Sequence, residues 1–216
     1  MRLALFGPPG AGKGTQSAFL TDSFGLSAIS TGNIIRKAIR EGNKLGPTLD
    51  AHIKDGGFVP DEIVQDLAKN SIVRNNFDQY VLDGFPRTLS QAEWLHNFLE
   101  AYKMPLQTVI FLDVPDDEVV ERLSHRRIHK LTCEPYHLLN HPPPEDVDPS
   151  LIIQRKDDRP EAIRFRLETY KRLTEPVERF YEDKGLLAKI SGVGSNAEIH
   201  ERILENLKPS LDYQIA

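Results

Sequence analysis

The feature that most constrains this chain is a glycine-rich segment between a short apolar run and a helical pattern. Leu3–Phe6 are apolar, Gly7–Thr15 read GPPGAGKGT, and a helical pattern continues to Phe24. A strand, a glycine-rich turn and a helix in this order direct backbone N–H groups and a helix N-terminus at one point, which suits phosphate oxygens. Lys13 adds a positive charge there. The segment therefore predicts a phosphate-binding loop, or P-loop.

One position departs from the common form of this loop, G-x-x-x-x-G-K-[ST]. Gly14 stands where Ser or Thr is usual, and Thr15 comes one residue later. The alternative is an ordinary glycine-rich turn, but the strand, the glycines and the lysine together argue against it.

Short apolar runs alternate along the chain with longer, charged stretches of helical period. Strands that are uniformly apolar are buried on both faces, as in a parallel sheet covered by helices. We therefore predict an α/β fold of the P-loop NTPase type, with a parallel five-stranded sheet flanked by helices. The predicted strands are Leu3–Phe6, Ser27–Ser30, Tyr80–Leu82, Val109–Val114 and Leu187–Ile190. The predicted helices are Gly12–Phe24, Thr31–Glu41, Asp61–Asn75, Leu89–Ala101, Asp116–Ser124 (with Asp116 as N-cap), Glu161–Asp183 and Asn196–Leu207.

Composition narrows the class of protein and its surroundings. The chain has 216 residues, enough for one compact unit with a small insertion. A net charge of -5 disfavours nucleic acid and anionic membranes as partners. Cys133 is the single cysteine, which excludes an internal disulfide and a four-cysteine zinc site. With no apolar run of about 18 residues and no signal peptide, we expect a cytoplasmic protein.

Residues 128–158 interrupt the alternation of strands and helices. This stretch is rich in proline and has no long periodic run, and arginines lie on both sides of it. A loop of this length inside a compact domain is usually functional or disordered. Because apolar residues such as Leu138 and Ile153 occur within it, we predict a small folded lid rather than a slack linker.

Two further segments suggest a second phosphate-binding region. Arg36 lies one turn inside the helix that follows the second predicted strand. Asp83 follows the third strand, Arg87 comes after a tight turn, and Gln91 is one helical turn further. The carboxyl ends of parallel strands are where open α/β sheets bind ligands. Each residue alone has an ordinary structural explanation, but their order after a P-loop indicates a kinase with an acceptor site.

Taken together, these motifs resemble those of bacterial-type adenylate kinases with a long lid, and the resemblance covers essentially the whole chain. It implies a nucleoside monophosphate kinase that carries out reversible, Mg²⁺-dependent transfer of the γ-phosphoryl group of ATP to AMP by direct in-line attack. Such an enzyme serves nucleotide biosynthesis and adenine nucleotide balance. The matching motifs are Gly7–Thr15, Ser30–Arg36, Gly57–Val59 with Asp61 and Glu62, Asp83–Arg87 with Gln91, and Arg155–Asp158.

The resemblance implies the site residues. Asp83 would hold Mg²⁺ through water, although Asn33 stands where the family usually has Asp. The residues implied in binding ATP are Gly10, Ala11, Gly12, Lys13, Gly14, Thr15, Arg126, Pro135, Tyr136 and Gly194. Those implied in binding AMP are Thr31, Arg36, Gly57, Phe58, Val59, Gly84, Phe85, Pro86, Arg87, Gln91, Arg155 and Arg166. The catalytic cations would be Lys13, Arg87, Arg122, Arg126, Arg155 and Arg166.

Within the lid, four positions correspond to those that hold zinc in metal-bearing relatives. Zinc favours thiolate and imidazole ligands, and Thr is not a usual ligand. We therefore expect no structural zinc and a hydrogen-bonded network that joins the lid loops. The four residues are His129, Thr132, Glu145 and Asp148.

The resemblance also implies how the chain is divided. Residues 1–29, 60–124 and 159–216 would form the core, residues 30–59 would bind the nucleoside monophosphate, and residues 125–158 would form the lid. ATP and AMP would be the partners, with Mg²⁺ as cofactor, and the chain would act as a monomer. Two alternatives stay open: a kinase for UMP, CMP or another nucleoside monophosphate, and a nucleotide-binding module without catalysis.

Overall fold

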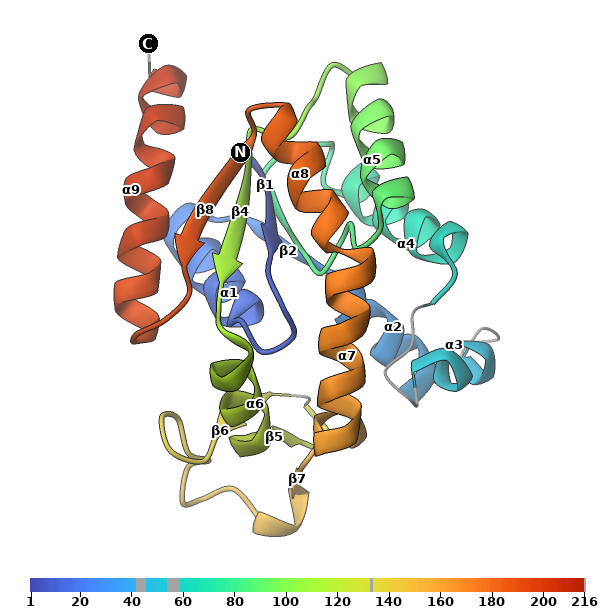
Figure 1. Ribbon diagram of the computed structural model, residues 1–216, viewed down its shortest axis with the longest axis vertical. Coiled ribbons are helices and arrows are strands. Elements are labelled where there is room, and N and C mark those ends of the chain that lie inside the picture. Colours follow the sequence, from blue (N-terminus) through green and yellow to red (C-terminus); the bar gives the residue numbers. More distant parts are fainter. Residues whose placement is uncertain (42–45, 54–58, 133, 216) are drawn as a thin grey trace.

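The centre of the molecule is a sheet of five parallel strands in the order β2-β3-β1-β4-β8 (Figure 1). This computed structural model describes residues 1–41, 46–53, 59–132 and 134–215. The sheet confirms the predicted fold class, and each strand begins and ends within one residue of its predicted limits. The strands are β1 Arg2–Phe6, β2 Ser27–Ser30, β3 Tyr80–Asp83, β4 Thr108–Asp113 and β8 Leu187–Ser191.

Buried side chains alternate between the two faces of this sheet. On β1, Leu3 and Leu5 belong to one apolar cluster, whereas Ala4 and Phe6 belong to the other. A strand places successive side chains on opposite faces, so a wholly apolar run suits a sheet that is covered on both sides. Helices α1 and α9 lie on one side of the sheet in Figure 1, and α4, α5 and α8 lie on the other. The helices are α1 Lys13–Phe24, α2 Thr31–Arg40, α3 Gly46–Ile53, α4 Asp61–Arg74, α5 Leu89–Ala101, α6 Asp116–His125, α7 Pro160–Leu173, α8 Glu175–Asp183 and α9 Asn196–Ile215.

The predicted helix Glu161–Asp183 is wrong, because the structure has two helices there. Helix α7 ends before Thr174, and α8 begins after it. Pro176 has no N–H to continue the hydrogen bonds of α7, which explains the break.

Other helix limits also differ from the predictions. Asp116 is the first residue of α6 and not its N-cap, which is Pro115. Helix α9 continues to Ile215, beyond the predicted end at Leu207. The sequence pattern does not predict α3, a short helix with proline in its first turn.

The proline-rich stretch forms a second, three-stranded sheet beyond the ends of α6 and α7 (Figure 1). Strand β5 Arg126–His129 lies in the middle and pairs antiparallel with β6 Pro135–His137 and β7 Ile152–Ile153. Two 3₁₀ turns follow in this segment, η1 Pro149–Leu151 and η2 Lys156–Asp158. The stretch is therefore a small folded insertion, as predicted.

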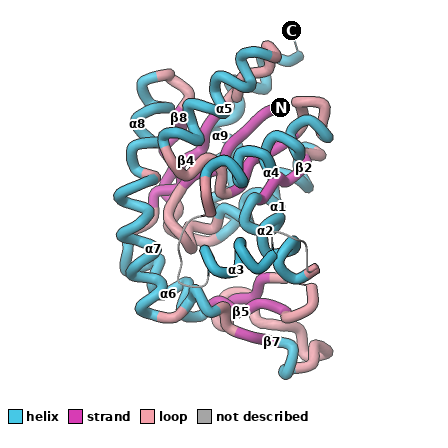
Figure 2. Tube along the Cα trace, turned by 90° about the vertical axis from the view of Figure 1, so that its right-hand side faces the viewer, coloured by secondary structure: helices cyan, strands magenta, loops and turns pink. Residues whose placement is uncertain are grey.

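Helices α2 and α3 lie next to this small sheet at one end of the molecule (Figure 2). Arg40 Nη1, at the end of α2, donates to the carbonyl oxygen of Leu131 at 3.3 Å. The segment after β2 and the insertion after α6 therefore meet across the carboxyl end of the sheet. In the described part of the chain, no helix has both the length and the apolar character needed to cross a membrane.

Candidate active site

The loop between β1 and α1 has the geometry of a phosphate cradle. Gly7, Gly10 and Gly12 have φ values of 135°, 79° and 92°, which L side chains rarely adopt. A Cβ at Gly7 would lie 2.6 Å from the carbonyl oxygen of Leu112, so only glycine fits there. Gly12 is the N-cap of α1 and offers no side-chain hydrogen bond. The first N–H groups of α1 are therefore available to a ligand, as a phosphate site requires.

Lys13 folds back over this loop. Its Nζ donates to the carbonyl oxygens of Gly7 and Pro8, both at 2.8 Å. Burial lowers the pKa of Lys13 to about 7, with Asp83 opposing the shift and Arg87 adding to it. The surroundings thus disfavour the charged ammonium group, and a bound anion would favour it again.

The turn after β3 joins several of the predicted residues. A Cβ on Gly14 would lie 3.8 Å from Asp83 Oδ2, so this carboxylate faces the start of α1. The carbonyl oxygen of Gly84 accepts hydrogen bonds from Thr31 Oγ1 at 3.0 Å and from Arg87 Nε at 2.8 Å. The P-loop, the start of α2 and Arg87 therefore meet at the carboxyl end of β3, where an open α/β sheet binds its ligand.

Arg36 enters the same region from α2. Its Nη2 donates to Asn33 Oδ1 at 2.6 Å, and its buried Nε has no hydrogen-bond partner within the described ranges. Burial lowers the pKa of Arg36, Asp157 opposes this, and Arg126 adds to the lowering. A buried guanidinium N–H without an acceptor is costly, so this position suits an anionic ligand.

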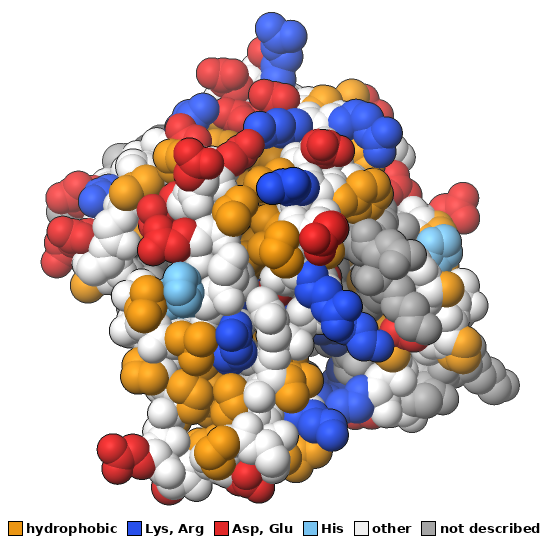
Figure 3. Space-filling model, turned by 60° about the horizontal axis from the view of Figure 1, so that its bottom comes forward, with side chains coloured by type: hydrophobic (Ala, Val, Ile, Leu, Met, Phe, Trp, Pro, Cys, Tyr) orange, Lys and Arg blue, Asp and Glu red, His pale blue; other side chains and the backbone are white. Residues whose placement is uncertain are grey.

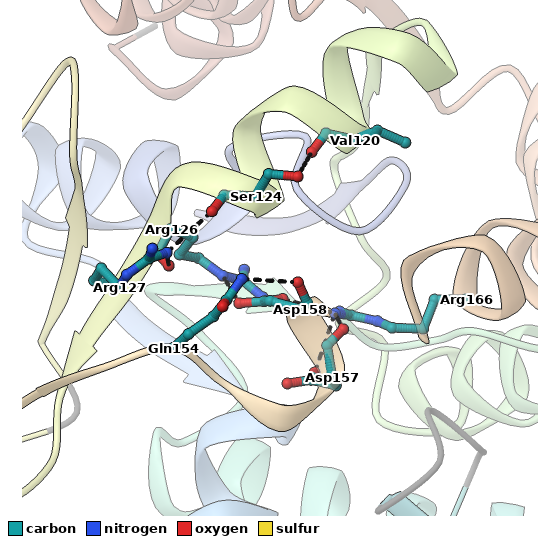
Figure 4. A network of polar contacts seen from close by, with 8 residues as sticks. All are labelled: Val120, Ser124, Arg126, Arg127, Gln154, Asp157, Asp158 and Arg166. Atoms are coloured by element: carbon teal, nitrogen blue, oxygen red, sulfur yellow. Dashed lines mark hydrogen bonds and ion pairs between the residues drawn. The ribbon is translucent and has the colours of Figure 1, made fainter. Parts of the chain in front are cut away.

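Two carboxylates hold the arginines at the ends of the small sheet (Figure 4). Asp158 is fully buried and accepts from Arg126 Nε at 2.7 Å and from Arg126 Nη2 at 2.5 Å. Arg166 Nη1 lies 3.1 Å from Asp157 and 3.2 Å from Asp158. Gln154 Nε2 donates to the carbonyl oxygen of Asp158 at 3.0 Å. Because Arg126 begins β5 and Arg166 lies on α7, these contacts join the two ends of the insertion.

Positive charge is thereby concentrated in one cleft. Burial lowers the pKa of Arg155 to about 9, and Arg126 and Arg36 lower it further. Burial also lowers the pKa of Arg87 and of Arg166, and neighbouring arginines add to both shifts. Arg87 is nevertheless exposed, and it lines a cavity beside Lys13. Figure 3 shows Lys and Arg side chains around a hollow on this face of the molecule.

Six of the predicted cations thus influence one another electrostatically, and three of them, Lys13, Arg87 and Arg166, line a cavity between β1, β3 and α7. Cations at such short range repel one another, so the arrangement favours a ligand with several negative charges. The six cations are Lys13, Arg36, Arg87, Arg126, Arg155 and Arg166.

Comparison with known proteins agrees with this geometry. The family model for adenylate kinase matches residues 5–186. An adenylate kinase of Salinibacter ruber is 49% identical over 96% of this chain and 98% of its own length. An adenylate kinase of Streptomyces avermitilis is 40% identical over 96% of this chain and 97% of its own length. An adenylate kinase of Methanosarcina barkeri is 39% identical over 96% of this chain and 99% of its own length. The chain belongs to the adenylate kinase family.

Membership makes the chain a nucleoside monophosphate kinase, as predicted from its motifs. The reaction of adenylate kinases is the reversible phosphoryl transfer ATP + AMP = 2 ADP, and the family uses ATP and Mg²⁺. Both nucleotides are polyanions, which is the kind of ligand that six converging cations suit.

Other residues implied by the adenylate kinase resemblance lie around this centre. Arg122 has partners of its own: its Nη2 donates to the carbonyl oxygen of Gly192 at 2.9 Å, and its Nε donates to Glu118 at 3.0 Å. Gly194 follows in the same loop after β8, with a φ of 114°. Tyr136 is buried on β6, directly after Pro135.

The residues expected around AMP are mostly buried. Thr31, Val59, Phe85 and Gln91 all have little exposed surface. Gly57 and Phe58 lie outside the described residues, so their predicted roles stay predictions.

Among the four lid positions, His129 and Thr132 contact each other, whereas Asp148 contacts Ser150. His129 Nδ1 accepts from the N–H of Thr132 at 3.1 Å and lies 3.0 Å from its Oγ1. Asp148 accepts from the N–H of Ser150 at 2.8 Å and thereby caps η1. Each of these contacts fixes its own loop.

Sequence reasoning assigned no role to Asp158, although it lies in the matching motif Arg155–Asp158. The structure shows that this carboxylate orients two of the cations. The available signal was a pair of acidic residues between two arginine-rich segments, since buried arginines need carboxylate partners.

Proposed function

We propose that this protein catalyses ATP + AMP = 2 ADP by direct in-line attack of the AMP phosphate on the γ-phosphoryl group of ATP. The convergence of six cations from the P-loop, α2, the turn after β3 and the ends of the small sheet supports this proposal. The second pKa of a phosphate monoester is about 6, so AMP is largely ionised near pH 7 and needs no general base. Catalysis then depends on positioning and on charge neutralisation.

On the donor side, the backbone N–H groups of Gly10–Thr15 would bind the ATP phosphates. Lys13 would move from the carbonyl oxygens of Gly7 and Pro8 to a phosphate oxygen. The left-handed glycines support this because they direct backbone N–H groups towards an anion, and a bound anion would favour the charged form of Lys13 that burial disfavours. Arg122 and Arg126 would reach the phosphates in transfer. Three residues from β6 and the loop after β8 would contact the rest of the donor nucleotide: Pro135, Tyr136 and Gly194.

On the acceptor side, Arg36 and Arg87 would bind the AMP phosphate. Arg155 and Arg166 would lie between the two nucleotides and neutralise the phosphoryl group in transfer. Their placement on both sides of the cleft supports this division. The AMP nucleoside would contact Thr31, Gly57, Phe58, Val59, Gly84, Phe85, Pro86 and Gln91.

The donor set around Asp83 fits Mg²⁺. This ion prefers oxygen ligands, keeps several waters, and is bound through one or two carboxylates together with substrate phosphates. Asp83 offers a carboxylate beside the first turn of α1, and it would hold the ion through water. The ion supplies further neutralisation of phosphate charge. Asn33 would add no carboxylate to this shell because its side chain is an amide, and its amide oxygen accepts from Arg36.

We infer that the chain works as a core of residues 1–29, 60–124 and 159–216, a nucleoside monophosphate-binding segment 30–59 and a lid 125–158. The separate sheet of the lid supports this division. Closing of such a lid, a motion well known in adenylate kinases, excludes water from the phosphates.

The lid would hold together without zinc. Hydrogen bonds from Thr132 already occupy His129 Nδ1, which supports this inference. All six cations come from one chain, which supports a monomer. We expect the cytoplasm as its location, where both nucleotides occur.

Parallel assays with AMP, GMP, UMP and CMP would test the proposal. Each acceptor is offered with ATP and Mg²⁺, and ADP formation is followed. We expect strong preference for AMP. Preference for a pyrimidine acceptor or GMP would overturn the acceptor assignment, and ATP binding without any transfer would indicate a nucleotide-binding module.

A further inference from the structure

A chain of hydrogen bonds fixes one buried amide at the start of α5. Gln91 is only 1% exposed. Its Oε1 accepts from the N–H of Arg87 at 2.7 Å, and its Nε2 donates to Asp61 Oδ1 at 2.6 Å. Asp61 Oδ2 also accepts from Thr88 Oγ1 at 2.8 Å. Asp61 therefore joins the first turn of α4 to the first turn of α5 and contacts the Gln91 side chain directly.

These partners leave Gln91 with one possible orientation. A backbone N–H can only donate and a carboxylate can only accept, so the two ends of the amide are not interchangeable. If the amide turned over, Oε1 would face Asp61 and Nε2 would face the Arg87 N–H, which places acceptor against acceptor and donor against donor. Burial prevents water from compensating for either mismatch. One N–H and one lone pair of the amide are left for another partner.

We propose that Asp61 is a positioning residue that determines which purine the acceptor site takes. This inference rests on the proposed role of Gln91 at the acceptor base. A glutamine amide can pair with adenine in bidentate fashion, accepting from the 6-amino group and donating to a ring nitrogen. A 6-oxopurine has a carbonyl oxygen in place of that amino group, so Gln91 Oε1 would face another acceptor. The site therefore takes 6-aminopurine monophosphates and rejects 6-oxopurine monophosphates.

Glutamine alone cannot make this distinction. An amide that has turned over donates to the 6-oxo group and accepts from the neighbouring ring N–H, and it then fits the 6-oxopurine. Selectivity comes from the penalty against turning over, which the Asp61 carboxylate and the Arg87 N–H impose together. Of these two groups, Asp61 is the one that a side-chain substitution can change.

The substitution Asp61→Asn tests the proposal, with AMP and IMP as acceptors because their bases differ only at the 6-position and the adjacent ring nitrogen. The new side chain has the same shape but can donate to Gln91 Oε1, so one of the two mismatches of the turned amide is removed, while the mismatch with the Arg87 N–H stays. We expect the AMP-over-IMP ratio of kcat/KM to fall at least tenfold, through the acceptor KM. The KM for ATP should stay unchanged. If Asp61→Asn folds poorly, Asp61→Ser replaces it as the test. This variant also removes the carboxylate, and it should give the same fall in the ratio.

Two control variants test whether the change in ratio comes from the orientation of Gln91 and not from a lost negative charge or a lower stability of the protein. Glu62→Gln removes one negative charge from the exposed neighbour in the same helical turn, and it should leave the ratio unchanged. Thr88→Val removes the N-cap of α5 but keeps the Asp61–Gln91 contact. It should lower Tm without changing the ratio.

The outcomes distinguish this inference from the proposed function. If the wild-type enzyme shows no preference for AMP over IMP, the role of Gln91 at the acceptor base is wrong. If the wild type prefers AMP and Asp61→Asn lowers only Tm, Asp61 is a structural contact and the inference fails while the function stands. An equal fall of the ratio in Glu62→Gln would also overturn it, because charge and not orientation would then be the cause.

Discussion

The cations of the P-loop and of α2 are held differently from those at the ends of the lid. Lys13 donates to two backbone carbonyl oxygens, and Arg36 donates to the amide oxygen of Asn33. Arg126 and Arg166 instead bind the carboxylates of the acidic pair 157–158. The first two cations therefore rest on neutral oxygens, and the other two rest on full negative charges.

This difference indicates two separate tasks: attracting the phosphates, and fixing the direction of the arginine side chains before a ligand binds. A buried cation on neutral oxygens has no carboxylate partner that a bound phosphate must displace, although its burial makes the unliganded protein less stable. A cation paired with a buried carboxylate is partly neutralised, but its direction is fixed before any ligand binds. The first arrangement suits residues that attract the phosphates, and the second suits arginines that must meet the phosphoryl group correctly oriented when the lid closes.

The largest expected effect follows from removing a cation that rests on neutral oxygens. Lys13→Met should lower kcat by about 10³-fold, because a preorganised charge at the phosphates is lost and loss of one such donor costs up to this much. Steady-state ADP formation with saturating ATP, AMP and Mg²⁺ measures it. Lys69→Met, an exposed lysine on α4, is the matched control and should be unchanged. A fall of less than tenfold would remove Lys13 from the catalytic group.

Removing a carboxylate from the lid hinge should act first on stability. Asp158→Asn leaves Arg126 and Arg166 without their buried charge partner, which costs about 3 kcal/mol of unfolding free energy. For a chain of this size, Tm should fall by roughly 6–12 °C. Asp157→Asn should cost less, since Asp157 is 28% exposed and pairs with Arg166. Equal Tm values for the two variants would contradict the importance of the Asp158 contacts.

A pH dependence sharpens the same contrast. The pKa of Lys13 is lowered from 10.5 to about 7 in the folded protein. Between these values the unfolded chain binds a proton that the folded chain does not, so this residue makes unfolding free energy rise with pH. Without nucleotide, Lys13→Met should be more stable than wild type at pH 7, and the gap should narrow towards pH 10. Urea unfolding from pH 7 to pH 10 measures this difference in unfolding free energy between the two proteins. A difference that stays constant with pH would show that burial of Lys13 does not destabilise the folded protein.

Much of the fold was predictable from the sequence because its signals are local. The three central strands, β1, β3 and β4, are short apolar runs, and burial on both faces of the sheet demands that pattern. The edge strands β2 and β8 are more exposed and carry polar residues. The division at Thr174 was missed because apolar periodicity continues across it, although Pro176 is a local signal of a break. Helix α3 was missed because its eight residues are too few for a clear period.

The site was less predictable because its contacts are not local. The pairing of β5 with β7 brings Arg126 and Asp158 together although they are 32 positions apart. No spacing rule places a carboxylate at that distance, and only the family resemblance indicated that these arginines share a site. The orientation of Gln91 is a similar case, since it depends on Asp61 from a different helix.

The smallest expected effect comes from giving Arg36, on α2, the kind of partner that the lid arginines have. Asn33→Asp would place a carboxylate 2.6 Å from Arg36 Nη2, where an amide oxygen now lies. Because Asn33 is exposed, this ion pair is worth under about 1 kcal/mol. The carboxylate would compete with the AMP phosphate for Arg36, so the KM for AMP should rise about threefold with an unchanged KM for ATP.

Salt and Mg²⁺ identify the cause of that change. Competition between exposed charges weakens as salt screens them, so the rise in KM should shrink between 0.05 M and 0.5 M KCl. Initial rates over a range of AMP concentrations, at low and high Mg²⁺, give both constants. If kcat at low Mg²⁺ increased instead and the KM for AMP did not rise, the new carboxylate would be serving the metal shell. That result would contradict the idea that a carboxylate at position 33 competes with the AMP phosphate for Arg36.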